Sequence, residues 1–185
     1  ERPDCTWRVS TGPIWRLLSQ LREGARDLVV GRMPPTGNFE GLSFRQLYWE
    51  RVVPVVRPGH PLAHPDWDPA MLPRYPLMLP PKGAVIAASV SAWFHAVGLG
   101  DPAPAYENVS LAFGRGVVQR SDTVWFISEG VVRPEIEAGL LSVLPVRNDL
   151  LGGPVGISLR RNTPPGADLA ALIEAITESA RDAAV

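Results

Sequence analysis

Apolar positions along the chain recur with two periods, one typical of helices and one typical of strands. Residues 14–23 and 168–182 carry leucine and isoleucine three or four positions apart, which predicts amphipathic helices. Residues 27–31 contain the apolar run Leu-Val-Val-Gly after Asp27, typical of a strand buried on both faces. Gly24 can end the first helix. A strand at 6–10 before that helix would complete a β-α-β unit.

The alternation of strand and helix returns in the middle of the chain. The spacing predicts strands at 75–79, 105–107, 123–127 and 140–144, with helices at 85–97, 111–119 and 129–138. Two further strands, at 42–48 and 51–57, separate this block from the first. Pro54 interrupts the second of them, which favours a sheet edge or a bend.

A strand at 155–160 and the helix at 168–182 remain at the end of the chain, with no partner nearby in sequence. The economical arrangement returns them to the first block. We therefore expect two α/β lobes with a cleft between them. Lobe I would comprise residues 1–49 and 152–185, and lobe II residues 50–151.

Composition limits the functions that the chain can have. Of its 185 residues, 45% are hydrophobic, which is enough for a buried core. The formal net charge is -1 with both signs scattered, whereas a nucleic-acid surface needs clustered basic residues. No apolar run approaches the ~18 residues of a membrane span, and the single cysteine, Cys5, is typical of a reducing compartment. The three histidines lack metal-ligand spacing, and no cofactor motif occurs.

Several short motifs occur in a recognisable order. They are Leu21-Arg-Glu-Gly24, Asp27-Leu-Val-Val-Gly31, His60-Pro-Leu-Ala63, Glu107-Asn-Val-Ser110 and Gly139-Leu-Leu-Ser-Val-Leu-Pro145. Their order and spacing resemble the effector-binding domain of LysR-type transcriptional regulators over nearly the whole chain. The likeness is greatest to regulators of protocatechuate and other aromatic-catabolism operons, in the segments Gly31-Arg-Met-Pro34, Asp122-Thr-Val-Trp-Phe-Ile-Ser128 and Gly153-Pro-Val-Gly156.

The resemblance implies two Rossmann-like lobes of the type II periplasmic-binding-protein kind, in a cytoplasmic protein without enzymatic activity or cofactor. It implies a small anionic effector, either an aromatic acid or a ring-cleavage product, and a homodimer or homotetramer. Family members bind DNA through an N-terminal helix-turn-helix domain and have a first strand of lobe I before the segment found here. Neither part is in this chain, so DNA binding is expected of the parent protein only.

Ligands of open α/β sheets bind beyond the carboxyl ends of strands, where helix N-termini offer backbone N–H groups. Four places in the sequence meet this rule. The candidate ligand contacts at these places are Thr11 and Gly12, then Arg32, then Pro81, Lys82, Gly83 and Ala84, and finally Ser128. The resemblance adds Val155 as an apolar contact position.

Arg32 is the most specific of these candidates. A guanidinium at the end of a buried strand suits a bidentate pair with a carboxylate. Muconate-sensing relatives have an arginine at the matching position. Each candidate also has a purely structural interpretation: Arg32 as a surface ion pair, Lys82 as a solvated side chain, and Thr11 or Ser128 as a helix cap.

Aromatic side chains are expected mainly in the core, because no basic residues surround them as on a base-stacking surface. This applies to Trp125 and Phe126 and to the other five tryptophans. The helix at 85–97 is a different case. Its apolar residues make it a candidate contact between subunits, through Val90, Trp93, Phe94 and Val97.

Three classes of function remain open. Effector sensing for transcription is the first. Capture of a solute for transport uses the same two-lobed design and would require an export signal, which does not open this chain. An enzyme is disfavoured, because no nucleophile–base pair or metal cluster can be assembled from the motifs.

Overall fold

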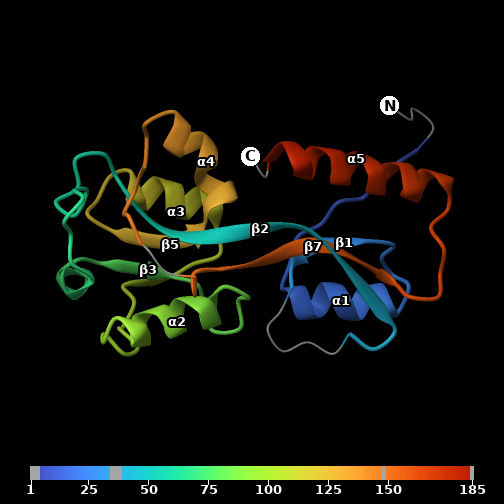
Figure 1. Ribbon diagram of the computed structural model, residues 1–185, viewed down its shortest axis with the longest axis horizontal. Coiled ribbons are helices and arrows are strands. Elements are labelled where there is room, and N and C mark those ends of the chain that lie inside the picture. Colours follow the sequence, from blue (N-terminus) through green and yellow to red (C-terminus); the bar gives the residue numbers. More distant parts are fainter. Residues whose placement is uncertain (1–4, 34–38, 147–148, 184–185) are drawn as a thin grey trace. The chain divides into compact units, whose positions relative to one another are not determined.

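The computed structural model describes residues 5–33, 39–146 and 149–183. The chain divides into two compact α/β units, which Figure 1 shows with their helices and strands labelled. Unit 1 comprises Glu1–Trp49 and Gly153–Val185, and unit 2 comprises Glu50–Gly152. Unit 2 is therefore one continuous segment inserted between the two segments of unit 1.

Among the described residues, unit 1 contains three strands and two helices. They are α1 (Ile14–Arg22), β1 (Val29–Arg32), the first part of β2 (Leu42–Val56), β7 (Gly152–Arg160) and α5 (Ala167–Ala183). The strand order is β1-β7-β2, and β1 and β7 are antiparallel, with Arg32 opposite Val155. The last strand and helix thus return to the first block, as the sequence pattern indicates.

Helix α1 is held to the sheet by a small apolar core. Leu18 and Leu21 lie on its buried face and pack with Val29 of β1 and Leu42 of β2. Figure 1 shows α5 on the opposite side of these strands from α1. The helix ends before Gly24, whose φ of 78° is the left-handed conformation that glycine adopts at little cost.

Unit 2 has a mixed sheet with helices on both faces. Its elements are the second part of β2, a 3-10 helix (Pro69–Arg74), β3 (Leu77–Leu79), α2 (Ala87–Ala96), β4 (Tyr106–Glu107), α3 (Leu111–Val118), β5 (Val124–Ser128), α4 (Glu129–Glu137) and β6 (Ser142–Val143). Strand β5 lies between β2, which is antiparallel to it, and β3, which is parallel to it. Strand β4 pairs parallel with β3, and β6 pairs antiparallel with β2.

The two faces of this sheet carry separate cores, because side chains alternate along each strand. Val52 and Phe126 pack with Trp93 and Phe94 of α2 on one face. On the other face, Val53, Val55, Met78 and Trp125 pack with Val118 of α3 and Val132 of α4. Figure 1 shows the same division, with α2 on one side of β3 and β5 and the pair α3 and α4 on the other.

The structure corrects two expectations about strands. Residues 6–10 form no strand, so α1 is not part of a β-α-β unit within the described residues. The two strands predicted at 42–48 and 51–57 are one strand, β2. Pro54 lies inside this strand and pairs with Phe126 of β5, whereas the β6 ladder on the other side begins only at Val55. The Leu144 amide donates a hydrogen bond to the Pro54 carbonyl, so the carbonyl and the nitrogen of Pro54 face the β6 side of the strand. Proline is tolerated there because the β6 ladder ends at this residue and needs no N–H donor from it.

Two expectations about apolar side chains are also wrong. Val90, Trp93 and Phe94 of α2 are buried in the unit 2 core, so they cannot form a contact between subunits. Trp67, Trp93 and Trp125 are buried as predicted, but Trp7, Trp15 and Trp49 are exposed. Sequence composition cannot separate these two groups, since only packing partners decide which aromatic rings are covered.

Candidate functional site

The candidate ligand residues of unit 1 lie around the carboxyl end of β1. Arg32 is the last residue of β1, and Val155 lies opposite it on β7. The first turn of α1 packs over the same end of the strand, because a Cβ on Gly31 would lie 3.2 Å from the Ile14 Cδ1 atom. The topology therefore places Arg32, Val155 and the segment leading into α1 at one end of unit 1.

The Arg32 guanidinium is partly engaged by the protein itself. Its Nη1 atom donates a 3.0 Å hydrogen bond to the Gly153 carbonyl, and the side chain is partly buried. A Cβ on Gly153 would lie 2.9 Å from the same Nη1 atom, so a larger residue there would shift the end of the Arg32 side chain. The arginine is thus held in a defined position against the start of β7.

The other unit 1 candidates have different surroundings. Thr11 and Gly12 are exposed in the irregular segment before α1. The N-cap of α1 is Pro13, without a side-chain cap hydrogen bond, so Thr11 does not cap this helix. A Cβ on Gly12 would meet only an ordinary 3.8 Å contact, so this position does not require glycine. Val155 is a core residue, with 6% of its surface exposed.

The candidate residues of unit 2 follow neighbouring parallel strands. Leu77 of β3 is in register with Val124 of β5 and Met78 with Trp125, so both strands end at the same edge of the sheet. The loop from Pro80 to Ala84 follows β3 there, and Ser128 ends β5. The structure thereby brings the Pro81–Ala84 loop and Ser128 to one edge, as the rule for open α/β sheets predicts.

The loop before α2 is a tight turn. The Ala84 amide donates to the Pro81 carbonyl at 3.0 Å, and Gly83 has a φ of 92°, which strains any other residue. Lys82 is exposed. Helix α2 begins at Ala87, two residues later than the sequence pattern indicates, and its N-cap Ile86 offers no side-chain hydrogen bond.

A residue of β2 that sequence reasoning missed, Glu50, contacts the N-terminus of α4. Ser128 is the N-cap residue, but its side chain makes no cap hydrogen bond. Instead the Gly130 amide donates to Oε1 of Glu50, from β2, at 3.2 Å. Beside it, the Arg51 guanidinium makes two 2.8 Å hydrogen bonds to the Glu129 carboxylate, which raise the pKa of Arg51 above its usual value. No sequence signal identifies Glu50, because it meets Gly130 across 80 residues.

The His60 side chain is part of the frame of unit 2. It is 3% exposed, and its Nδ1 atom accepts a 3.0 Å hydrogen bond from the Leu62 amide. Its Nε2 atom lies 3.2 Å from the Asp122 carbonyl. Burial lowers the pKa of His60 from the ordinary 6.5, against smaller raising effects of Asp122. The His-Pro-Leu-Ala segment is thereby fastened to the loop that precedes β5.

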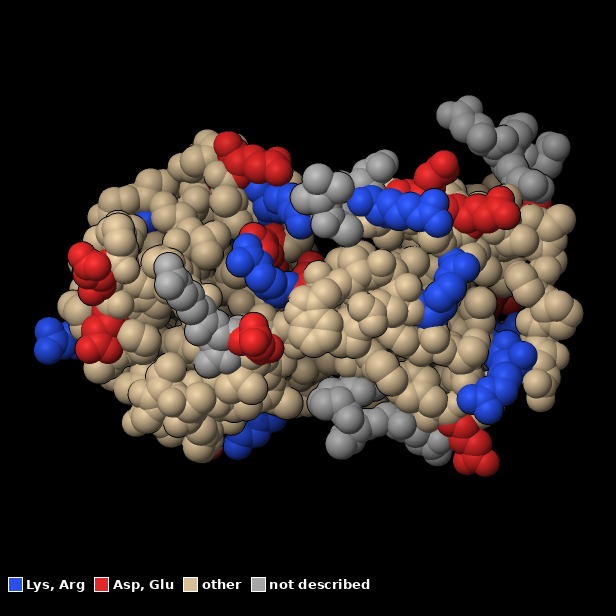
Figure 2. All heavy atoms as spheres, viewed as in Figure 1, with Lys and Arg blue, Asp and Glu red and all other residues tan. Residues whose placement is uncertain are grey.

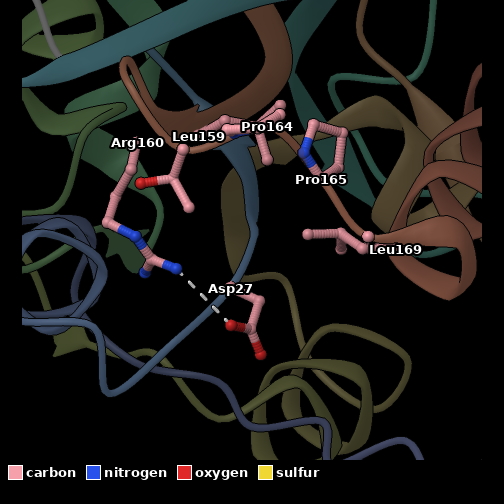
Figure 3. A pocket seen from close by; sticks show the side chains of 8 residues that line it. Asp27, Leu159, Arg160, Pro164, Pro165 and Leu169 are labelled. Atoms are coloured by element: carbon pink, nitrogen blue, oxygen red, sulfur yellow. Dashed lines mark ion pairs between the residues drawn. The ribbon is translucent and has the colours of Figure 1, made fainter.

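A cavity of about 130 Å³ lies in unit 1 at the start of α5. Its lining includes Arg160, Asp27, Pro164, Pro165 and Leu169, and Figure 3 shows the ion pair between the first two. The Arg160 Nη1 atom donates to the carbonyls of residues 21 and 26, at 3.1 and 2.6 Å. This arginine therefore caps the C-terminal end of α1, and we assign the cavity no ligand.

Charged groups of both signs are mixed on one face of the molecule. On the face that Figure 2 shows, basic and acidic side chains lie beside each other, without a continuous basic area among the described residues. Within those residues, no group of three or more histidine, cysteine or carboxylate side chains could hold a metal ion. No helix in the described part of the chain is long and apolar enough to cross a membrane.

Comparison with known proteins gives consistent matches. Residues 1–181 match the model of the LysR substrate binding domain. A relative named HTH-type transcriptional regulator PcaQ, from Agrobacterium fabrum, is 41% identical over 174 residues, which cover 94% of this chain and 56% of the relative. The chain thus spans about half the length of this relative.

Solved structures share the fold at much lower sequence identity. The regulatory domain of CcmR from Synechocystis PCC6803, in complex with 2-PG, has a TM-score of 0.74 at 14% identity over 90% of this chain and 79% of that chain. The effector binding domain of QuiR, in complex with shikimate, has a TM-score of 0.73 at 14% identity over 92% of this chain and 79% of that chain. At this level of identity the likeness establishes the fold alone.

Proposed function

This chain belongs to the LysR substrate-binding domain family, and on that premise we propose that it is the effector-sensing domain of a transcriptional regulator. The observation that carries the proposal is the family match over residues 1–181. The relatives PcaQ and YdcI, the latter from Escherichia coli, are named HTH-type transcriptional regulators, which does not favour the transport alternative. Units 1 and 2 correspond to lobes I and II of the domain.

In the parent protein, which we expect in the cytoplasm, a separate domain contacts DNA and this domain reports the effector to it. The domain itself carries out no catalysis. Such coupling requires that the effector bind two states of the regulator with different affinity. The net charge of -1 and the mixed charges on the face shown in Figure 2 agree with a role that does not include binding nucleic acid directly.

The effector that we propose is a small carboxylate, either an aromatic acid or a product of ring cleavage. Two features support an anion. Arg32 ends β1 in a defined position, and arginine is the side chain best suited to a bidentate carboxylate pair. The loop from Pro81 to Ala84 precedes α2, where backbone N–H groups and the helix dipole favour negative charge. Thr11, Gly12, Ser128 and Val155 are further proposed contacts.

A thermal-shift screen tests this proposal. Aromatic acids such as protocatechuate and ring-cleavage acids such as carboxymuconate are compared with sugar acids and with neutral analogues that lack the carboxylate. A ligand that binds only the folded state at a hundredfold excess over its Kd adds about 2.7 kcal/mol of stability. We expect an aromatic or ring-cleavage acid to raise the Tm and its neutral analogue not to. If only neutral compounds or sugar acids raise the Tm, the proposed effector class is wrong.

A further inference from the structure

The carboxylate of Glu50 takes the position at the N-terminus of α4 where an anion would bind. A helix N-terminus carries unpaired N–H groups and a partial positive charge. In α4 an N-cap side chain would normally accept a hydrogen bond from the second or third amide of the helix. Oε1 of Glu50 does so at Gly130, the second residue of α4, whereas the Ser128 side chain does not.

The close approach of this carboxylate depends on glycine at position 130. A Cβ on Gly130 would lie 2.6 Å from Oε1 of Glu50, which no normal contact allows. Glycine inside a helix costs about 1 kcal/mol relative to alanine. Gly130, which favours a helix less than alanine does, thus lies where the Glu50 carboxylate approaches the backbone of α4.

Glu50 lies at the same edge of the sheet as the Pro81–Ala84 loop. Val52 of β2 is opposite Ser128, so Glu50 lies just beyond the carboxyl end of β5. The loop follows β3, on the other side of β5. Two strand spacings separate β2 from β3, which amounts to roughly 10 Å. A benzene ring with substituents at opposite positions can bridge such a distance.

We infer that Glu50 is a specificity-determining residue of the effector site, and that it selects a hydroxyl group over a second carboxylate. The inference rests on the proposed function and narrows its effector class to aromatic hydroxy acids. An acid whose carboxylate lies at the Pro81–Ala84 loop presents its far substituent to Glu50. A hydroxyl there donates a hydrogen bond to the Glu50 carboxylate, whereas a second carboxylate meets a like charge, which is strongly unfavourable in a partly buried site.

Calorimetric titration with two matched acids tests this inference. The probes are 4-hydroxybenzoate and benzene-1,4-dicarboxylate, which share the ring and the first carboxylate. The proteins are the wild type, Glu50→Gln and the control Glu137→Gln, which removes an equal charge from the exposed far end of α4. We expect the wild type and the control to bind the hydroxy acid at least roughly tenfold more tightly, and Glu50→Gln to lose roughly tenfold or more of that preference.

Each outcome decides the inference. A preference that is unchanged in Glu50→Gln, or a wild type that prefers the dicarboxylate, overturns it and leaves the proposed function standing. Failure of both acids to bind all three proteins also overturns it, and the thermal-shift screen then decides the proposed function separately. Should Glu50→Gln fail to fold, Gly130→Ala replaces it, because its new Cβ displaces the same carboxylate while improving the helix. Gly130→Ala must then lower the preference as well.

Discussion

His60 shows how the role of a single residue follows from groups distant in sequence. The motif His-Pro-Leu-Ala identifies His60 in the sequence, but the residue that it contacts, Asp122, is 62 positions further along the chain. The neutral ring can accept at Nδ1 and donate at Nε2 at the same time. A protonated ring has N–H groups at both nitrogens and can no longer accept from the Leu62 amide.

Acidification should therefore destabilise the fold through His60. Because burial lowers its pKa in the folded state, the folded chain binds fewer protons than the unfolded chain. The contribution of His60 to the free energy of unfolding is complete above pH 6.5. It is lost as the pH falls from 6.5 toward the pKa that His60 has in the folded state. Each unit by which that pKa is lowered corresponds to about 1.4 kcal/mol. Urea unfolding of the wild type should thus show a larger loss of free energy between pH 7.5 and 5.0 than His60→Gln.

The variant His64→Gln is the control for this measurement, since His64 is exposed and close in sequence. It should lose as much free energy of unfolding over this pH range as the wild type. If His60→Gln shows the same loss as the wild type, another group causes the acid sensitivity.

Arg32 carries the second prediction at this scale. If it pairs with the effector carboxylate, Arg32→Ala should weaken binding by about 2–4 kcal/mol, the scale for truncating one partner of a buried charge pair. That is roughly thirtyfold to a thousandfold in Kd. Arg32→Lys should restore only part of the affinity, because an ammonium cannot form two parallel hydrogen bonds. Calorimetric titration with the acid that binds most tightly in the screen measures the affinity of both variants. Unchanged affinity in a folded Arg32→Ala protein would remove Arg32 from the site.

At the scale of elements, helices were predicted more accurately than strands. The helical period is set within one segment, so α1, α3 and α4 agree with the predicted ranges to within a residue or two. A strand forms only where a partner supplies hydrogen bonds, and residues 6–10 have none among the described residues. The places of the candidate ligand residues followed from the rule for strand ends. The place of Glu50 could not be predicted by this rule, because it depends on a contact between β2 and α4.

Two glycines of α3 should respond oppositely to the same substitution. A Cβ on Gly114 would lie 2.6 Å from Cζ2 of the buried Trp125, whereas one on Gly116 would lie 3.8 Å from its nearest neighbour, on Arg120. Overpacking of a core typically costs about 1–3 kcal/mol, so Gly114→Ala should destabilise the protein. Gly116→Ala should stabilise it by up to about 1 kcal/mol, because alanine favours the helix. Urea unfolding measures the change in the free energy of unfolding for each variant. Changes of the same sign would contradict this packing of α3.

At the scale of the whole molecule, the family leads us to expect self-association as a dimer or tetramer. Phe113 at the start of α3 is 46% exposed and packs edge-on against Tyr106, which is 37% exposed. We predict concentration-dependent association in light scattering, and that Phe113→Asp weakens it at least roughly tenfold. Leu140→Asp, at an exposed position after α4, is the control and should associate like the wild type. A monomer from micromolar to millimolar concentration would refute the prediction.

The insertion of unit 2 within unit 1 also determines the order in which the parts can fold on the ribosome. All residues of unit 2, Glu50–Gly152, leave the exit tunnel before residues 155–158, the part of β7 that pairs with β1. Domains generally fold as units during synthesis. The nascent chain can therefore complete unit 2 while β1 still lacks its partner strand. Unit 1 can therefore complete its sheet only after the whole of unit 2 has been synthesised.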